Sequence, residues 1–273
     1  MVDNKDDVFA GIDIGAAFAK AVILVDGDIA AWVVIPSGNN YRTAADKVLQ
    51  AAMENARPGT GHPIRIVATG CGAGMVAFAQ DSAGEFVCNA RAVHHLAPGA
   101  RTVIDIGGQF SRVFHIDRGG RMTGFILSEK CAAGSGRVLQ VVARVLQVPL
   151  EELGELSLKS KNKIDFTTSC AVFMESEVIS RIAEGISRED IAAGVHRSLA
   201  AKVQVLVERL GFQPEIAFIG GAANNRGLVK SLEETLQCKL VIPAMPQIVT
   251  AMGAALIASD RVKDTGKAEQ FNR

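Results

Sequence analysis

The chain lacks an excess of charge of either sign. Its 29 Lys and Arg residues balance 29 Asp and Glu residues, so no net field draws it toward a polyanion or an anionic membrane surface. One Trp and one Tyr leave few aromatic platforms on which single-stranded bases could stack. We therefore expect neither nucleic acid nor membrane among its partners.

Long apolar runs are also missing. The longest uninterrupted one, Ile29–Ile35, has the length of a strand, whereas a membrane-spanning helix needs about 20 apolar residues. The first seven residues are polar and acidic, without the apolar core of a secretion signal, which predicts a cytoplasmic location. Five cysteines, an odd number, argue against a disulfide framework in that compartment. The 27 glycines and the 48% hydrophobic share instead favour a compact, turn-rich enzyme.

The chain contains an internal repeat. Residues 11–22 recur 92 positions later as residues 103–114, with Ile, Asp, Ile, Gly, Phe and a cation in register. Each copy predicts a buried strand that ends in an Asp-x-Gly turn, then two more strands, a helix and a strand that runs into glycine. The predicted ranges are 20–25, 29–35, 43–55 and 64–70 in the first copy, and 112–116, 122–127, 132–146 and 215–221 in the second. Extra helices follow in the second copy, the longest beginning after Ser187 and ending at Gly211. This pattern predicts an α/β protein with two lobes and a cleft between them.

The repeated turns favour polyphosphate binding. Backbone N–H groups at Gly15, Gly107 and Gly108 can approach phosphates closely because glycine has no Cβ. Asp13 and Asp105 are placed to hold hydrated Mg²⁺, which prefers one or two carboxylates plus waters. A third glycine pair, Gly220-Gly221, opens a helix together with Asn225, and its N–H groups suit an α-phosphate or nucleoside. Neither a P-loop nor a strand-linked dinucleotide-binding motif occurs.

Two cysteines, Cys131 and Cys170, stand at the predicted starts of helices. A thiolate there has a lowered pKa and favours metal ligation or reactivity. The small residues Gly134 and Gly136 that follow Cys131 leave the backbone open to something bulky or anionic. Two ligands cannot complete a zinc site or a cubane cluster, but a two-fold dimer would bring four together. The remaining cysteines are interpreted as small buried hydrophobes: Cys71, Cys88 and Cys238.

Several motifs carry a family resemblance. They are Gly11-Ile-Asp-Ile-Gly15, Asp105-Ile-Gly-Gly-Gln109, Cys131-Ala-Ala-Gly-Ser-Gly-Arg137, Cys170 with Glu175-Ser-Glu-Val-Ile-Ser180, Gly194-Val-His-Arg-Ser198, Gly220-Gly221 with Asn225, and Gly253-Ala-Ala-Leu256. From about Phe9 to Ala258, the chain resembles the activators of 2-hydroxyacyl-CoA dehydratases and the ATPase subunits of benzoyl-CoA reductases. These belong to the superfamily of acetate and sugar kinases, heat-shock cognate proteins and actin.

The resemblance implies a duplicated actin/sugar-kinase-like ATPase with a nucleotide cleft between its lobes. The first lobe would span 8–100, the second 101–260 with a cluster-bearing helical insertion, and a polar tail 261–273. It implies a homodimer, or a pseudo-dimer with a paralogue, that shares one [4Fe-4S] cluster through Cys131 and Cys170. ATP hydrolysis, with Mg²⁺, would drive one electron from reduced ferredoxin or flavodoxin to an acyl-CoA dehydratase or reductase of anaerobic metabolism. Catalytic roles fall on Asp13, Asp105 and Gln109. ATP or ADP would contact Gly15, Lys20, Gly107, Gly108, Gly134, Gly136, Gly220, Gly221, Asn225 and Gln247.

The chain departs from the family pattern at both turns. Ala16 and Ala17 stand where hydroxyl residues are common, Phe110 replaces an acid and Arg112 replaces a lysine. Two alternatives therefore stay open: a sugar or N-acetylhexosamine kinase on the same fold, with Asp105 as base, and a degenerate nucleotide-binding scaffold subunit paired with a paralogue.

Overall fold

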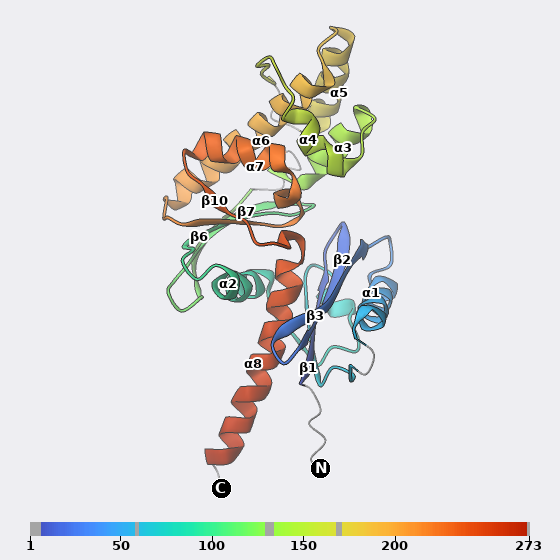
Figure 1. The fold of residues 1–273 in the computed structure, drawn as a ribbon, viewed down its shortest axis with the longest axis vertical. Coiled ribbons are helices and arrows are strands. Elements are labelled where there is room, and N and C mark those ends of the chain that lie inside the picture. The colour runs from blue at the N-terminus through green and yellow to red at the C-terminus, as the bar shows by residue number, and fades with distance from the viewer. Residues whose placement is uncertain (1–6, 58–59, 129–133, 168–170, 272–273) are drawn as a thin grey trace. The chain divides into compact units, whose positions relative to one another are not determined.

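The computed structural model describes residues 7–57, 60–128, 134–167 and 171–271. The chain forms two units (Figure 1). The first combines the residues up to Leu96 with those from Ile248 onward, and the second is Ala97–Gln247. The C-terminal part thus returns to the first unit, whereas the sequence predicted a second lobe of 101–260 and a tail of 261–273.

The first unit is built on a five-stranded sheet in the order β3-β2-β1-β4-β5. β1 pairs antiparallel with β2 and parallel with β4. The strands are β1 Val8–Ile14, β2 Phe18–Val25, β3 Asp28–Pro36, β4 Arg65–Thr69 and β5 Asp81–Ser82, and the helices are α1 Tyr41–Asn55, α2 Glu85–Leu96 and α8 Val249–Phe271.

Helices cover both faces of this sheet. Successive side chains of a strand point to opposite faces, so the residues of β1 contact a different helix on each face. Ala10, Ile12 and Ile14 share a buried core with the apolar side of α1. The alternate residue Gly11 faces α8, so that a β-carbon there would collide with the backbone of Ala251. β1 is therefore buried on both sides, and Asp13 lies on the face that carries Gly11.

The second unit repeats this topology. Its sheet has the order β10-β9-β6-β7-β8, in which β6 pairs antiparallel with β7 and parallel with β9. The strands are β6 Thr102–Ile106, β7 Ser111–Ile116, β8 Met122–Leu127, β9 Ile216–Ile219 and β10 Leu240–Val241. Matching β6 to β1, β7 to β2, β8 to β3 and β9 to β4 reproduces the first sheet, which confirms the internal repeat. The cross-strand register repeats too: Asp13 lies opposite Lys20, and Asp105 opposite Arg112.

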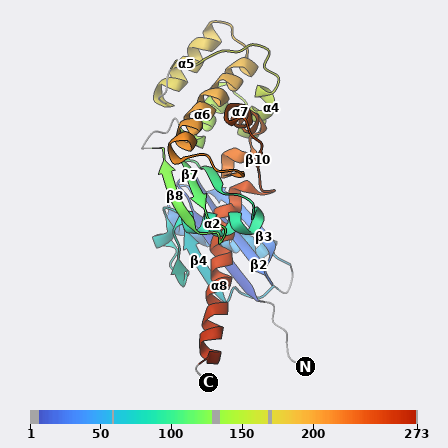
Figure 2. The same cartoon turned by 90° about the vertical axis from the view of Figure 1, so that its left-hand side faces the viewer.

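The second unit carries more helices than the first. They are α3 Gly136–Val145, at the position in the repeat that α1 has in the first unit, α4 Leu153–Ser157, α5 Ala171–Ala183, α6 Arg188–Leu210 and α7 Arg226–Leu236. The predicted cap of α6 is confirmed, because the Ser187 side chain accepts a hydrogen bond from the Asp190 amide at 3.2 Å. One side of α6, including Ile191, Leu199 and Val203, packs into the core of this unit, and α6 runs beside α7 (Figure 2).

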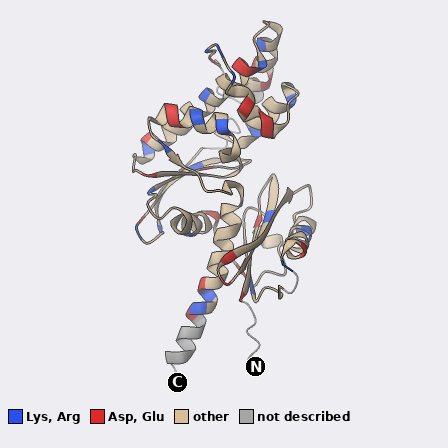
Figure 3. Ribbon diagram, in the orientation of Figure 1, with Lys and Arg blue, Asp and Glu red and all other residues tan. Residues whose placement is uncertain are grey.

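Cations and anions are interspersed along the helices of the second unit (Figure 3), as the balanced composition predicts. Within the part of the chain that the structure describes, every helix is too short or too polar to cross a bilayer.

Candidate functional site

The first predicted phosphate turn joins β1 to β2. Asp13, the penultimate residue of β1, is 2% exposed, and its carboxylate lies 2.8 Å from Lys20 Nζ in an ion pair set by the strand register. The turn is closed by a 3.1 Å hydrogen bond from the Gly15 amide to the Phe18 carbonyl. The second carboxylate oxygen of Asp13, Oδ1, is buried and has no hydrogen-bond partner among the described residues. A buried carboxylate oxygen without a partner is costly, and a hydrated cation would satisfy it.

The second turn, between β6 and β7, has the same construction. The Gly107 amide donates to the Phe110 carbonyl, again at 3.1 Å. Asp105 is 6% exposed and lies 3.9 Å from Arg112 Nε, a looser pair than its counterpart in the first unit. Gln109 is exposed in this turn, where its amide can reach solvent or a ligand. The two turns are therefore structural equivalents, one in each unit.

A glycine from the neighbouring parallel strand packs against each aspartate. Gly70 follows β4 with φ +88°, and a β-carbon there would collide with Asp13 Oδ1. Gly220 follows β9 with φ +87°, and a β-carbon there would stand 2.7 Å from Asp105 Oδ1. Positive φ and close approach both require glycine at these positions. Gly70 was not among the predicted site residues, although the repeat of a strand running into glycine signalled it.

The Gly220-Gly221 turn contacts the segment that carries Gln247. Gly220 donates its amide to the Pro246 carbonyl at 2.9 Å, and Gly221 faces the Gln247 side chain. The structure thus brings these three predicted nucleotide contacts together beside Asp105.

Asn225, the fourth predicted contact near this turn, has other partners. Its Oδ1 accepts the Leu228 amide at 2.9 Å and so caps α7, and its Nδ2 lies 3.1 Å from His196 Nε2. His196 is fully buried, and its Nδ1 lies 3.0 Å from the Ser157 hydroxyl. The pKa of His196 is lowered to about 3, chiefly by burial and in addition by the charge of Arg197. Both side chains therefore belong to the interior of the second unit.

The Gly-Ser-Gly sequence that follows Cys131 is bonded to the second phosphate turn. Gly136, the first residue of α3, donates its amide to the Gly107 carbonyl at 2.9 Å. Gly134 accepts a hydrogen bond from the Ser111 hydroxyl with its carbonyl oxygen. Ser135 caps α3 by accepting the Arg137 amide. Gly136 packs so closely on the turn that a β-carbon there would lie 3.1 Å from the Gly107 carbonyl oxygen, which favours glycine at this position.

Cys131 and Cys170 lie outside the described residues. Among the residues that are described, no three of His, Cys, Asp and Glu gather in a way that could hold a metal ion. Cys88 is fully buried, and burial raises the pKa of its thiol to about 11, which fits its interpretation as a small hydrophobe. For Cys71 the interpretation as a buried hydrophobe is wrong. This residue is exposed, and its thiol donates to the Ile14 carbonyl at 3.4 Å.

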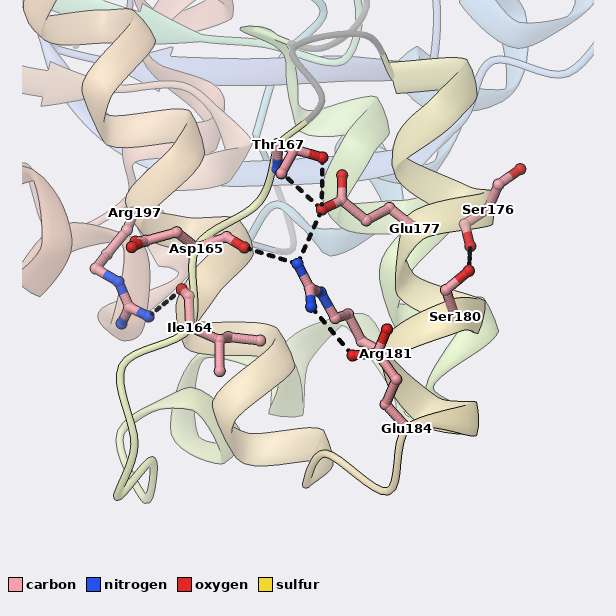
Figure 4. Close-up of polar contacts among 9 residues, drawn as sticks. All are labelled: Ile164, Asp165, Thr167, Ser176, Glu177, Ser180, Arg181, Glu184 and Arg197. Carbon is pink, nitrogen blue, oxygen red and sulfur yellow. Dashed lines mark hydrogen bonds and ion pairs between the residues drawn. The ribbon is translucent and has the colours of Figure 1, made fainter.

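A polar cluster holds the chain just before Cys170 (Figure 4). One carboxylate oxygen of Glu177, on α5, accepts both the amide of Thr167 at 2.9 Å and its hydroxyl at 3.2 Å. Arg181 lies 3.4 Å from the same oxygen, donates to the Asp165 carbonyl at 3.2 Å and pairs with Glu184 at 3.0 Å. Glu177 is only 14% exposed. Nothing in the sequence spacing indicated its contact with Thr167.

Comparison with known proteins matches nearly the whole chain. The sequence profile of the BadF/BadG/BcrA/BcrD ATPase family covers residues 10–258. The chain is 39% identical over 258 residues to a 2-hydroxyisocaproyl-CoA dehydratase activator from Clostridioides difficile, covering 94% of this chain and 97% of that one. It is 31% identical over 237 residues to one of the subunits of benzoyl-CoA reductase from Thauera aromatica, covering 84% and 83%.

Comparison with solved structures leads to the same group of proteins as the sequence comparison. The activator of the 2-hydroxyisocaproyl-CoA dehydratase from Clostridium difficile, solved with bound ADPNP, superposes with a TM-score of 0.89 at 38% identity, covering 96% of this chain and 97% of that one. A ROK family glucokinase from Streptomyces griseus, at 13% identity, gives a TM-score of 0.59 over 93% and 99% of the two chains and shows the fold alone. The predicted duplicated actin/sugar-kinase-like fold is confirmed, and so is the family resemblance that the motifs indicated. The chain belongs to the BadF/BadG/BcrA/BcrD ATPase family.

Proposed function

We propose that this protein is an ATP-dependent activator that passes single electrons to a 2-hydroxyacyl-CoA dehydratase or a benzoyl-CoA-reductase-type enzyme. Relatives with 39% identity are named as activators of such dehydratases, and the chain spans almost their entire length. The observation that carries the proposal is the bonding of the Gly-Ser-Gly sequence after Cys131 to the second phosphate turn. It joins the turn that we assign to phosphate binding to the residues that follow Cys131 in the sequence.

ATP with Mg²⁺ is the nucleotide that we assign to the two turns. Gly15, Gly107 and Gly108 offer backbone donors to phosphate oxygens. The unpartnered Oδ1 of Asp13 fits a water of hydrated Mg²⁺. Asp105 takes the equivalent role in the second unit, and we assign the exposed Gln109 to the hydrolysis step.

Further nucleotide contacts are assigned around these turns. Lys20, held at Asp13, supplies positive charge near the phosphates. Gly220, Gly221 and Gln247 lie together beside Asp105 and suit the α-phosphate or nucleoside. We reassign Asn225 from nucleotide contact to helix capping.

Cys131 and Cys170 are the proposed ligands of a [4Fe-4S] cluster. Each chain offers two thiolates, so two copies, or one copy and a paralogue, supply the four ligands that such a cluster takes. When bound, the cluster supplies one-electron chemistry whose potential depends on charge and hydrogen bonds around its sulfurs. The partner enzyme accepts the electron, and reduced ferredoxin or flavodoxin replaces it.

Anaerobic purification followed by iron analysis tests this proposal. We expect about four irons per dimer in the wild type. Cys131→Ser and Cys170→Ser should each lose the iron and weaken the dimer, because each change removes two of the four ligands. Cys238→Ser is the control, since this partly buried thiol stands apart in the sequence from both motifs, and it should keep the iron. A wild-type protein that stays monomeric and iron-free after reconstitution would refute the assignment.

ATP hydrolysis is measured on the same material. We expect turnover by the isolated chain that depends on Mg²⁺. Hydrolysis that stays negligible until a paralogue is added would instead favour the scaffold alternative, for which Ala16, Ala17 and Phe110 are the sequence arguments.

A further inference from the structure

Ser111 in the second unit bonds two residues that lie on either side of residues 129–133 in the sequence. It is the first residue of β7, directly after the turn Gly107–Phe110, and is 1% exposed. Its hydroxyl donates to the Gly134 carbonyl, and its amide donates to the Ser128 hydroxyl at 3.0 Å. Its carbonyl accepts the Ser128 amide at 2.8 Å. One buried residue thus bonds both Ser128 and Gly134.

Those two partners flank residues 129–133 in the sequence, and Gly134 leads directly into α3. The start of α3 is held to the turn by a second bond, from the Gly136 amide to the Gly107 carbonyl at 2.9 Å. The turn itself is closed by the bond between Gly107 and Phe110. The N-terminus of α3 is therefore held at two points, by the Gly136 backbone bond to the turn and by the bond of the Gly134 carbonyl to the Ser111 side chain on β7.

We propose that Ser111 is a positioning residue that transmits nucleotide occupancy of the second phosphate turn to the N-terminus of α3. The inference rests on the proposed function only in that nucleotide must bind at this turn. Hydrogen bonds weaken steeply with distance and angle, so a shift of the turn on phosphate binding strains both fastenings unless α3 follows. Without the Ser111 hydroxyl, the Gly134 carbonyl loses this donor and the start of α3 is released from the strand.

Amide hydrogen exchange of the full-length protein tests the proposal without any bound cluster. Exchange across residues 134–142 is compared in the apo protein, with Mg-ADP and with a non-hydrolysable Mg-ATP analogue. We expect the analogue to slow wild-type exchange at the start of α3 by about tenfold, since local opening there depends on the turn. In Ser111→Ala we expect the nucleotide-dependent difference to fall below about twofold while nucleotide affinity changes by less than about threefold.

The controls separate coupling from a loss of local stability. Ser111→Thr keeps the hydroxyl and should restore the response. Ser180→Ala removes another serine-to-carbonyl bond, to Ser176 on α5 (Figure 4), and should leave the response at the wild-type size. Ser128→Ala, which removes the acceptor of the Ser111 amide, provides a second, independent variant and should also weaken the response.

The outcomes are distinguishable. Normal nucleotide binding with an undiminished response in Ser111→Ala and Ser128→Ala overturns the inference and leaves the proposed function standing. A wild-type chain that binds no nucleotide overturns both. A raised basal exchange with an intact nucleotide-dependent difference would show that Ser111 is merely structural.

Discussion

Gly220 stands so close to Asp105 that a β-carbon at residue 220 would lie 2.7 Å from Oδ1 of the carboxylate. Gly70 approaches Asp13 in the same way in the other unit. In both units a glycine at positive φ, placed by the adjacent parallel strand, limits where the carboxylate can point. The duplicated site therefore depends on residues from two strands in each unit, rather than on the Asp-x-Gly turns alone.

Gly220→Ala should disable the site more than it disturbs the backbone. The methyl group would displace the Asp105 carboxylate or the Ile106 carbonyl, whose oxygen would be only 2.5 Å from the added carbon. We expect nucleotide affinity to fall by at least about tenfold, in addition to a cost of about 1 kcal/mol for alanine at positive φ. Titration with a fluorescent ATP analogue and urea unfolding measure the two effects.

Gly185→Ala is the matched control for this change. Gly185 also has positive φ, at +79°, but a β-carbon there meets nothing within 4 Å. It should show the backbone cost of about 1 kcal/mol and unchanged nucleotide affinity. Equal losses of affinity in the two variants would contradict the role assigned to Gly220.

Asp105→Asn should slow ATP hydrolysis while the fold persists. The amide retains the shape of the carboxylate but lacks the charge that we propose holds hydrated Mg²⁺. Because charged groups aimed at a reacting phosphate contribute on the order of 100-fold or more to the rate, we expect a loss of about that size. Phosphate release at saturating Mg-ATP is the measurement. Asp117→Asn changes an aspartate in the exposed turn between β7 and β8, where it pairs with Arg121, and should leave the rate unchanged.

Glu177→Gln should loosen the segment that precedes Cys170. Its carboxylate oxygen accepts two hydrogen bonds from Thr167 (Figure 4), and weakening them should cost about 1–2 kcal/mol of unfolding free energy. Amide exchange at Thr167 should accelerate in parallel. Glu184→Gln alters the other carboxylate that bonds Arg181, but this side chain is 52% exposed and an exposed pair contributes little. Similar effects in both variants would count against a specific role for Glu177.

Much of the fold was predictable because the internal repeat consists of contiguous sequence motifs, residues 11–22 and 103–114. The register that places Asp13 opposite Lys20 and Asp105 opposite Arg112 follows from the short turns that the sequence displays. The return of the chain to the first unit was not predictable in this way. α8 begins with an alanine-rich stretch and packs against β1, β4 and α2, and a stretch that is apolar all round carries no stripe that indicates its neighbours.

The glycine turns could be predicted from the sequence, whereas contacts between side chains that are distant in the sequence could not. Gly15, Gly107 and Gly220 could be found from their motifs. The role of Ser111 could not be found in this way, because no sequence pattern indicates that a buried serine at the start of a strand bonds Gly134, 23 residues later. The capping role of Asn225 could not be predicted either, because a residue that opens a helix after a glycine turn suits a nucleotide or a cap, and only its contacts with Leu228 and His196 reveal the cap.

The buried His196 predicts how stability depends on pH. Its pKa is about 3 in the folded chain, against an ordinary value of 6.5, so the unfolded chain binds a proton that the folded chain rejects. The stability that neutral His196 confers is therefore complete above pH 6.5 and is lost as the pH falls toward 3. Linkage gives a loss of about 2 kcal/mol between pH 7 and pH 5 from this residue. Urea unfolding of the wild type at both pH values should reveal it.

His196→Gln isolates that contribution. The amide can still bond Ser157 and Asn225 but does not titrate, so the variant should begin less stable at pH 7 and lose about 2 kcal/mol less than the wild type on going to pH 5. The other strongly perturbed group nearby, Asp190, does not interfere. The Asn162 amide, first among several hydrogen-bond donors, holds its pKa well below the ordinary range, and its contribution is lost only at lower pH. If wild type and variant lost equal stability over this interval, His196 would have to be protonated in the folded state, and the hydrogen bond from Asn225 to its Nε2 could not exist.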